Sequence, residues 1–225
     1  MRSLPTLRRG FLLCRTGWGV FKGGGLASKI VVSVLPKMLQ ARLGGRASQS
    51  ADKIRLCLQG EILSLSKHLR SESAGQPALT GMGATLVMAL LRGRHAHVAH
   101  MGDSRCYLFR KGRLTQLTKD HSVVGILLQA GEITTEEAKT HPARGKITRF
   151  IGMEAEVYPD IRSVPLKKGD RLLLCSDGVT GMVPDAEIAA LLSQNPEPKA
   201  ACQALVAAAN LAGGKDNITA VIVEK

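Results

Sequence analysis

The sequence predicts an α+β domain built in layers, and three observations support this prediction. The first third contains two long segments with apolar residues at helical spacing, the centre contains several short strand-type segments, and two helical segments precede a last strand. Helix pairs that alternate with runs of strands favour separate layers over a parallel strand–helix–strand series. The 225 residues are enough for one domain with a full hydrophobic core.

The chain begins with a short strand and two helices. Residues 11–14 (FLLC) are expected to form the strand, and a loop with five glycines follows at positions 17–25. A helix is expected from about Leu26 to Leu43, bent or restarted at Pro36, because proline removes a backbone hydrogen bond. Apolar residues that recur every three or four positions predict a second helix from about Ala51 to Ser71.

The centre is rich in strand-type sequence, and its apolar runs are bounded by turn residues. The Lys111-Gly112 pair is expected to close a tight hairpin between two of these strands. The expected strands are ATLVMALL (84–91), HAHVAHMGDS (95–104), CYLFR (106–110) and RLTQLT (113–118).

The last hundred residues mix helices and strands. A helical segment is expected from Ser122 to about Thr140, with a break at Gly131, and further helices at 184–193 and 198–211. The remaining expected strands are KITRFI (146–151), one near VYPDIRSV (157–164), RLLLCSD (171–177) and NITAVIV (217–223).

Charge and cysteine content limit the classes of function. The formal net charge is +13, and residues 1–51 hold nine Lys or Arg and no acid. This start fits a polyanion-binding patch, a targeting peptide, or a segment that has lost its acids. Seven aromatic residues offer few platforms for stacking bases, so nucleic acid is a disfavoured partner. Five scattered cysteines without a C-x-x-C pair favour a reducing, cytoplasmic location, and no apolar run is long enough to span a bilayer.

Three aspartates stand out among the 18 acidic residues. Asp103 lies in HMGDSR at the end of a strand, Asp177 ends RLLLCSD, and Asp216 lies in GGKDN before the last strand. A carboxylate at a strand end beside glycine is held rigidly yet is open to solvent, as Mg²⁺ and Mn²⁺ sites require. Each residue alone also fits an ordinary loop cap.

The second part of the chain resembles the metal-dependent protein serine/threonine phosphatases (PPM, or type 2C), especially their compact bacterial members. Five ordered motifs carry the resemblance, and together they cover roughly residues 80–225. They are TGMGATLV (80–87), AHMGDSRCYLFRKGRLTQLTKDHS (99–122), HPARGKITRFIG (141–152), KKGDRLLLCSDGVTGMV (167–183) and GGKDNITAVIV (213–223).

The resemblance implies a single PPM-type domain over residues 1–225, with an atypical basic start at 1–10. Its fold would be a four-layer α-β-β-α sandwich, in which helix pairs flank two mainly antiparallel sheets. It also implies chemistry, in which two Mg²⁺ or Mn²⁺ ions activate a water that attacks phosphorus in phosphoserine or phosphothreonine. The expected partners are phosphoproteins and a Ser/Thr kinase or its substrates, and the expected state is a monomer.

The resemblance also assigns residues. Asp177 and Asp216 would bind one metal ion of the pair, and Asp103 would help to hold a third, weaker one. Gly17 would contribute its backbone from a degenerate metal loop. The segment from Leu127 to Ile151 would be the mobile flap beside the active site, along which a substrate passes. Beyond the metal ligands, no catalytic side chain is assigned.

The sequence departs from the family pattern in its first part. Thr16 stands where the family has an aspartate that bridges both metals, and Gly181 stands where many members have Asp or Asn. The opening strands, with a phosphate-binding Arg and Asn-Glu-Asp acids, are missing. Either the chain is degenerate or truncated, or its start reflects a frame error. Reduced activity is expected, and the alternative functions are a pseudophosphatase that binds phosphoproteins or kinases and, more distantly, a nucleic-acid-associated protein.

Histidines suggest a further site but support it weakly. His95 and His97 would share one face of a strand, and His100 would lie on the other face. A structural role is favoured over metal binding for these three. His121 and His141 flank the expected flap, where a supporting polar role is favoured over acid catalysis.

Overall fold

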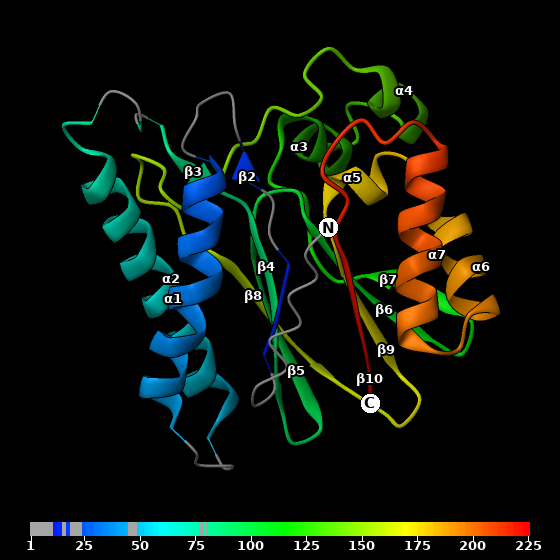
Figure 1. Ribbon diagram of the computed structural model, residues 1–225, viewed down its shortest axis with the longest axis horizontal. Helices are drawn as coiled ribbons and strands as arrows, with labels where there is room; N and C mark the ends of the chain where they lie inside the picture. The colour runs from blue at the N-terminus through cyan, green and yellow to red at the C-terminus, as the bar shows by residue number, and fades with distance from the viewer. Residues whose placement is uncertain (1–10, 15–16, 19–23, 45–48, 77–78, 80) are drawn as a thin grey trace.

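The computed structural model describes residues 11–14, 17–18, 24–44, 49–76, 79 and 81–225. Figure 1 shows four layers, with α1 and α2 on one outer face, two sheets in the middle, and α6 and α7 on the other face. This arrangement confirms the expected α-β-β-α sandwich. Within the described part of the chain, no helix is both long and apolar enough to cross a membrane.

Two antiparallel sheets of four strands each form the centre. The first has the strand order β1-β4-β5-β8, the second has the order β10-β9-β6-β7, and β2 pairs with β3 as a separate ribbon. The strands are β1 (Phe11–Cys14), β2 (Gly17–Trp18), β3 (Gly83–Ala84), β4 (Leu86–Arg92), β5 (His95–Met101), β6 (Arg105–Arg110), β7 (Arg113–Gln116), β8 (Asp160–Pro165), β9 (Arg171–Cys175) and β10 (Ala220–Glu224).

The helices form the outer layers and a group at one end of the sheets. In Figure 1 α3 and α4 lie at this end, and the last part of α3 and all of α4 belong to the segment predicted as the flap, Leu127 to Ile151. The helices are α1 (Gly24–Leu43), α2 (Ala51–Ser73), α3 (Val123–Ala130), α4 (Thr135–Thr140), α5 (Asp177–Thr180), α6 (Asp185–Gln194) and α7 (Pro198–Leu211).

Apolar side chains alternate between two cores along the central strands. On β4, Met88 packs against the helix pair α1–α2, whereas Val87 and Ala89 pack between the two sheets. On β9, Leu174 lies between the sheets, and Leu173 faces α6 and α7. Both faces of each sheet are therefore buried, which explains why these strands are continuous apolar runs.

Local signals in the sequence act as expected at several positions. Lys111 and Gly112 have φ angles of 51° and 77°, the left-handed pair that a two-residue hairpin turn needs between β6 and β7. Gly131 ends α3 with a φ of 74°. The hairpin and the break in the flap are therefore confirmed.

Several expected boundaries are wrong. KITRFI forms no strand, because Ile147 bridges Ser122 and Ile151 bridges Ala84, so the segment spans two separate partners. The last strand begins at Ala220, three residues later than expected. Pro36 lies within one uninterrupted helix, α1, so the helix does not restart there.

Some expectations fall on residues that the structure does not describe. Thr16, most of the glycine loop and the basic start at residues 1–10 lie outside the described residues. The prediction that the family's opening strands are missing before Phe11 also falls on residues outside the described part of the chain.

Candidate metal centre

Asp103 is presented by a turn that only glycine can form. Gly102, directly before it, has a φ of 113°, and a Cβ at this position would lie 2.5 Å from the methyl carbon of Thr85. Backbone and packing therefore both require glycine here. Asp103 is only 9% exposed, and its Oδ1 is buried without a hydrogen-bond partner among the described residues.

Asp177 and Asp216 are held together by the junction of β9 and β10. The Ser176 hydroxyl donates to the carbonyl of Asn217 at 2.8 Å and accepts from the N–H of Thr219 at 3.0 Å. Gly178 lies directly against the loop that carries Asp216, since a Cβ on Gly178 would lie 2.5 Å from the Asn217 carbonyl oxygen. Close contact between these two backbones therefore sets the relative position of the two carboxylates.

Asp177 begins the short helix α5 and does not end a strand as expected. Strand β9 stops at Cys175, and the N–H of Gly178 donates to Asp177 Oδ1 at 3.0 Å. A carboxylate in the first turn of a helix is favoured by the exposed N–H groups. Asp216 has a similar local contact, since its Oδ1 accepts from the N–H of Asn217 at 2.6 Å.

Asp177 repels both Asp103 and Asp216. Burial, followed by the charges of Asp177 and Asp120, raises the pKa of Asp103 to about 7. Burial and the charge of Asp216 raise the pKa of Asp177. The structure thus brings together three acids that are far apart in the sequence, and they form an electronegative site at one end of the sheets.

This donor set fits a divalent cation. The unpartnered Oδ1 of Asp103 and the mutual repulsion of the carboxylates are both relieved by a cation. Oxygen donors of this kind suit Mg²⁺ and Mn²⁺. Asp103 is buried, Asp177 is half-buried and Asp216 is exposed, so the site is open to solvent on one side.

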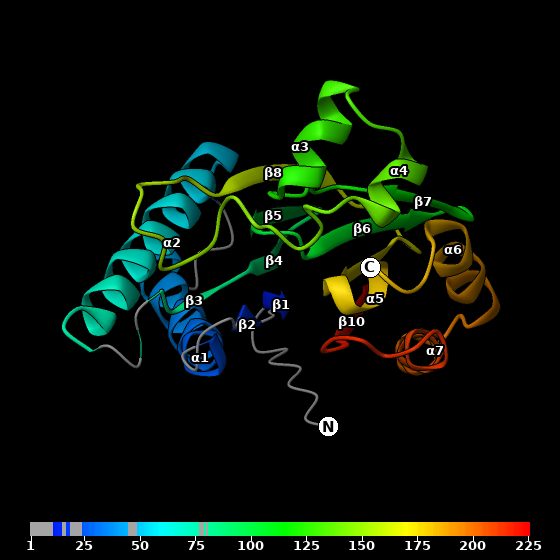
Figure 2. The same ribbon diagram turned by 90° about the horizontal axis from the view of Figure 1, so that it is seen from above.

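Gly17 lies in β2, which pairs with β3 through the partners Gly17 and Ala84. Figures 1 and 2 show β2 and α5 at the same end of the molecule. Position 181 lies on the α5 side of the site, where a Cβ would be 2.9 Å from the Asp177 carbonyl oxygen and 3.6 Å from Nη2 of Arg144. Arg144, in the segment predicted as the flap, therefore lies close to the residue that ends α5.

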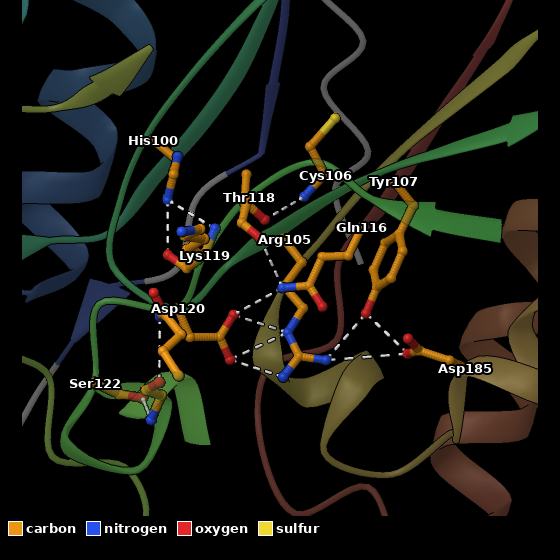
Figure 3. A network of polar contacts seen from close by, with 12 residues as sticks. His100, Arg105, Cys106, Tyr107, Gln116, Thr118, Lys119, Asp120, Ser122 and Asp185 are labelled. Carbon is orange, nitrogen blue, oxygen red and sulfur yellow. Dashed lines mark hydrogen bonds and ion pairs between the residues drawn. The ribbon is translucent and has the colours of Figure 1, made fainter. Parts of the chain in front are cut away.

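A hydrogen-bond network centred on Arg105 lies next to the candidate metal centre. It was not predicted from the sequence. Arg105 on β6 binds both oxygens of Asp120, with a shortest distance of 2.7 Å, and donates to the Tyr107 hydroxyl at 3.0 Å. Tyr107 in turn donates to Asp185 on α6 at 2.9 Å (Figure 3). A bidentate arginine–carboxylate pair fixes the orientation of both groups. Arg105 follows Asp103 by two residues in GDSR, which is the signal that sequence reasoning could have used.

The histidines make different contacts. Nδ1 of His97 lies 2.7 Å from the Ser163 hydroxyl. His100 stacks on His121, with ring centroids 4.5 Å apart. Ligand-type atoms of His100, His121 and Asp160 all lie within 4.8 Å of one another, a grouping that the sequence did not predict. His141 accepts from the N–H of Ala143 at 3.1 Å within the flap.

The layered fold and the carboxylates at one end of the sheets agree with those expected of a metal-dependent protein phosphatase. The family described as "Protein phosphatase 2C" matches residues 9–212. The chain belongs to this family, the metal-dependent protein serine/threonine phosphatases.

Individual relatives agree with this assignment. The "Serine/threonine phosphatase stp" of Listeria welshimeri is 37% identical over 209 residues, which cover 93% of this chain and 82% of that protein. The structure of the serine/threonine phosphatase Stp1 from Staphylococcus aureus superposes with a TM-score of 0.86 at 32% identity and covers 96% of this chain and 83% of that one. The catalytic domain of PstP in complex with two manganese ions superposes with a TM-score of 0.82 at 33% identity and covers 96% and 87%.

Proposed function

We propose that this chain removes phosphate from phosphoserine and phosphothreonine in proteins, with Mn²⁺ as the cofactor. The observation that carries the proposal is the electrostatic contact of Asp177 with both Asp103 and Asp216, with raised pKa values for Asp103 and Asp177. Relatives across most of the chain are named serine/threonine phosphatases. No relative's name supports the alternative of a binding module without turnover.

Asp177 and Asp216 would hold one ion, and Asp103 would contribute to a weaker site nearby. A divalent cation at such a site supplies positive charge for the phosphoryl oxygens and lowers the pKa of a bound water. The chain itself contributes the fixed orientation of the carboxylates, through Ser176 and Gly178. The Gly17 backbone would complete the site from β2. A kinase that modifies the same substrates, a monomeric state and a cytoplasmic location complete the proposal.

The test compares Mn²⁺ binding and phosphate release from a phosphothreonine peptide. Asp177→Asn and Asp216→Asn should each lower Mn²⁺ affinity and turnover by at least about tenfold, because a ligand oxygen with a full charge is lost. Asp52→Asn is the matched control, since Asp52 is an exposed aspartate on α2 and should leave both quantities unchanged.

The outcomes separate the two candidate functions. A folded protein that binds Mn²⁺ and releases phosphate supports the enzyme. A folded protein that does neither, yet still binds the phosphopeptide, would establish the binding module. Thr16→Asp adds information on a residue outside the described part of the chain: higher Mn²⁺ affinity would place position 16 at the metals, and full activity is not expected from this change alone.

A further inference from the structure

His121 lies where both ends of the flap meet the turn that carries Asp103. Its backbone N–H donates to the carbonyl of Gly102 at 3.0 Å, and its carbonyl accepts from the N–H of Thr148 at 2.8 Å. The next residue, Ser122, bridges Ile147. One short segment is therefore bonded on one side to the turn before Asp103 and on the other side to the chain that returns from the flap.

The imidazole of His121 makes a second set of bonds between the same parts. Nδ1 accepts from the N–H of Gly102 at 3.3 Å, and Nε2 lies 3.3 Å from Oδ2 of Asp160 at the start of β8. Because Nδ1 is an acceptor, the ring proton is on Nε2, which donates to Asp160. His121 is only 5% exposed, so its bond to Gly102 is shielded from water, whereas 46% of the Asp160 side chain is exposed.

The neighbours of His121 keep it neutral and oriented. Burial and the adjacent His100 lower the pKa of His121 to about 4, and burial lowers the pKa of His100 as well. The stacked His100 is itself bonded to the carbonyl of Lys119 at 2.8 Å. Burial alone would raise the pKa of Asp160, but the hydrogen bond from His121 lowers it.

A metal ion is not needed to explain this cluster. Arg149 donates to Oδ1 of Asp160 at 3.0 Å and lies 3.5 Å from Nε2 of His121. The guanidinium therefore supplies the positive charge that Asp160 requires. Arg149 directly follows Thr148, so the return segment of the flap is tied to the cluster by a side chain as well as by its backbone.

We propose that His121 is a positioning residue of the metal centre. Its Nδ1 holds the turn of Gly102 and Asp103, and its Nε2–H holds the base of the flap through Asp160, so flap order and Mn²⁺ affinity at Asp103 depend on each other. The inference rests on the proposed function for the identity of the ion and adds a link between metal binding and the flap. By thermodynamic linkage, an ion that binds better when the flap is ordered must also order the flap.

Three substitutions of His121 distinguish the effect of its bond to Gly102 from the effect of its bond to Asp160. In His121→Asn the amide oxygen replaces Nδ1 as the acceptor for Gly102, but the link to Asp160 is lost. In His121→Gln the amide N–H reaches toward Asp160 in place of Nε2, but the acceptor for Gly102 is lost. His121→Phe removes both bonds and retains a ring that stacks on His100.

The measurements are Mn²⁺ affinity by calorimetry and the rate of tryptic cleavage within the flap, where Lys139, Arg144 and Lys146 are exposed. Loss of the Gly102 bond in His121→Gln and His121→Phe should weaken Mn²⁺ binding about tenfold or more, the usual effect of losing a group behind a metal ligand. His121→Asn should lose less affinity than these two variants, because it keeps the Gly102 bond and weakens Mn²⁺ binding only through the loosened flap. Cleavage of the flap should accelerate in His121→Asn and His121→Phe, and Mn²⁺ should slow cleavage in the wild type much more than in His121→Phe.

His97→Asn is the matched control, because His97 is an equally buried histidine on β5 that is bonded to Ser163 instead. It should change neither measurement. Wild-type Mn²⁺ affinity and wild-type cleavage in all folded His121 variants would overturn the inference while the proposed function stands. A wild type that binds no Mn²⁺ would overturn the proposed function and the inferred effect of His121 on Mn²⁺ affinity. The cleavage rates would still decide whether His121 holds the base of the flap. Should His121→Phe fail to fold, the Asn and Gln variants test each bond separately.

Discussion

At the scale of single residues, the chemistry of the site depends on burial. Asp103 has the ordinary side chain of any aspartate, yet its carboxylate is placed in a position where burial and two neighbouring acids disfavour its charge. A cation reverses this effect, because its charge offsets both the burial and the repulsion by neighbouring acids that raised the pKa of Asp103. The free protein and the metal-bound protein should therefore differ in how they respond to pH.

Asp103→Asn tests this electrostatic cost in the presence of a chelator. The pKa of Asp103 in the folded protein, about 7, exceeds that in the unfolded chain, so between pH 4 and 7 the folded state holds more protons. Stability contributed by this group is present at low pH and is lost as pH rises through 7, by at most about 4 kcal/mol. Urea unfolding from pH 4 to 8 should show wild type losing stability relative to Asp103→Asn. Parallel pH profiles for the two proteins would contradict this account.

With Mn²⁺ added, the order of stability of the wild type and Asp103→Asn should change. The ion stabilises the wild type more than the variant, because a ligand that binds only the folded state raises its stability. A Tm that rises equally for both proteins would place the ion elsewhere.

At the scale of elements, the junction of β9, α5 and β10 decides the spacing of two ligands. Ser176 connects the two strands through its hydroxyl, and Gly178 lets α5 touch the loop before β10. The junction is rigid because each contact is a hydrogen bond or a close backbone approach between neighbouring strands.

Gly178→Ala should disturb this junction. The added methyl group would lie 2.5 Å from the carbonyl oxygen of Asn217, so the loop with Asp216 must move away from Asp177. Mn²⁺ affinity and turnover should both fall by about tenfold or more. Unchanged Mn²⁺ binding, measured by calorimetry on folded protein, would show that the loop adapts without cost.

Gly60→Ala is the matched control for this substitution. Gly60 lies on α2 with no atom within 4 Å of a Cβ built there. Alanine is the better helix former by about 0.5–1 kcal/mol. The variant should therefore be slightly more stable and should bind Mn²⁺ as the wild type does.

At the scale of the whole molecule, stability depends on the core between the sheets. Leu174 is fully buried in this core. On β9 it pairs with Val221 of β10 on one side and with Cys106 of β6 on the other. Leu174→Ala should lower the free energy of unfolding by about 2–5 kcal/mol, since a cavity is left between layers that cannot collapse fully. Urea unfolding followed by circular dichroism measures this loss.

Leu56 provides the comparison, because it lies on α2 with 60% of its surface exposed. Leu56→Ala should change the stability by no more than about 0.5 kcal/mol. Equal losses in the two variants would mean that the two sheets do not depend on a shared core.

The amino-acid sequence alone predicts most of the layers and the family. Helical and strand periodicity predicted the layers, the Lys111-Gly112 pair predicted its hairpin, and the motifs around Asp103, Asp177 and Asp216 predicted the family and the acids. These features are local, because each depends on residues within one turn, one strand or one motif. The KITRFI segment misled for the same reason: its apolar pattern is that of a strand, but its two bridges go to different partners.

Contacts between residues that are far apart in the sequence depend on the tertiary fold. The pairing of β5 with β8 brings His100 opposite Asp160, and the return of the flap brings Arg149 to both Asp160 and His121. It also brings the Asp103 turn into electrostatic contact with Asp177. The physical reason is that strand order and register depend on the burial of whole sheet faces, a property of the assembled core that no single segment carries.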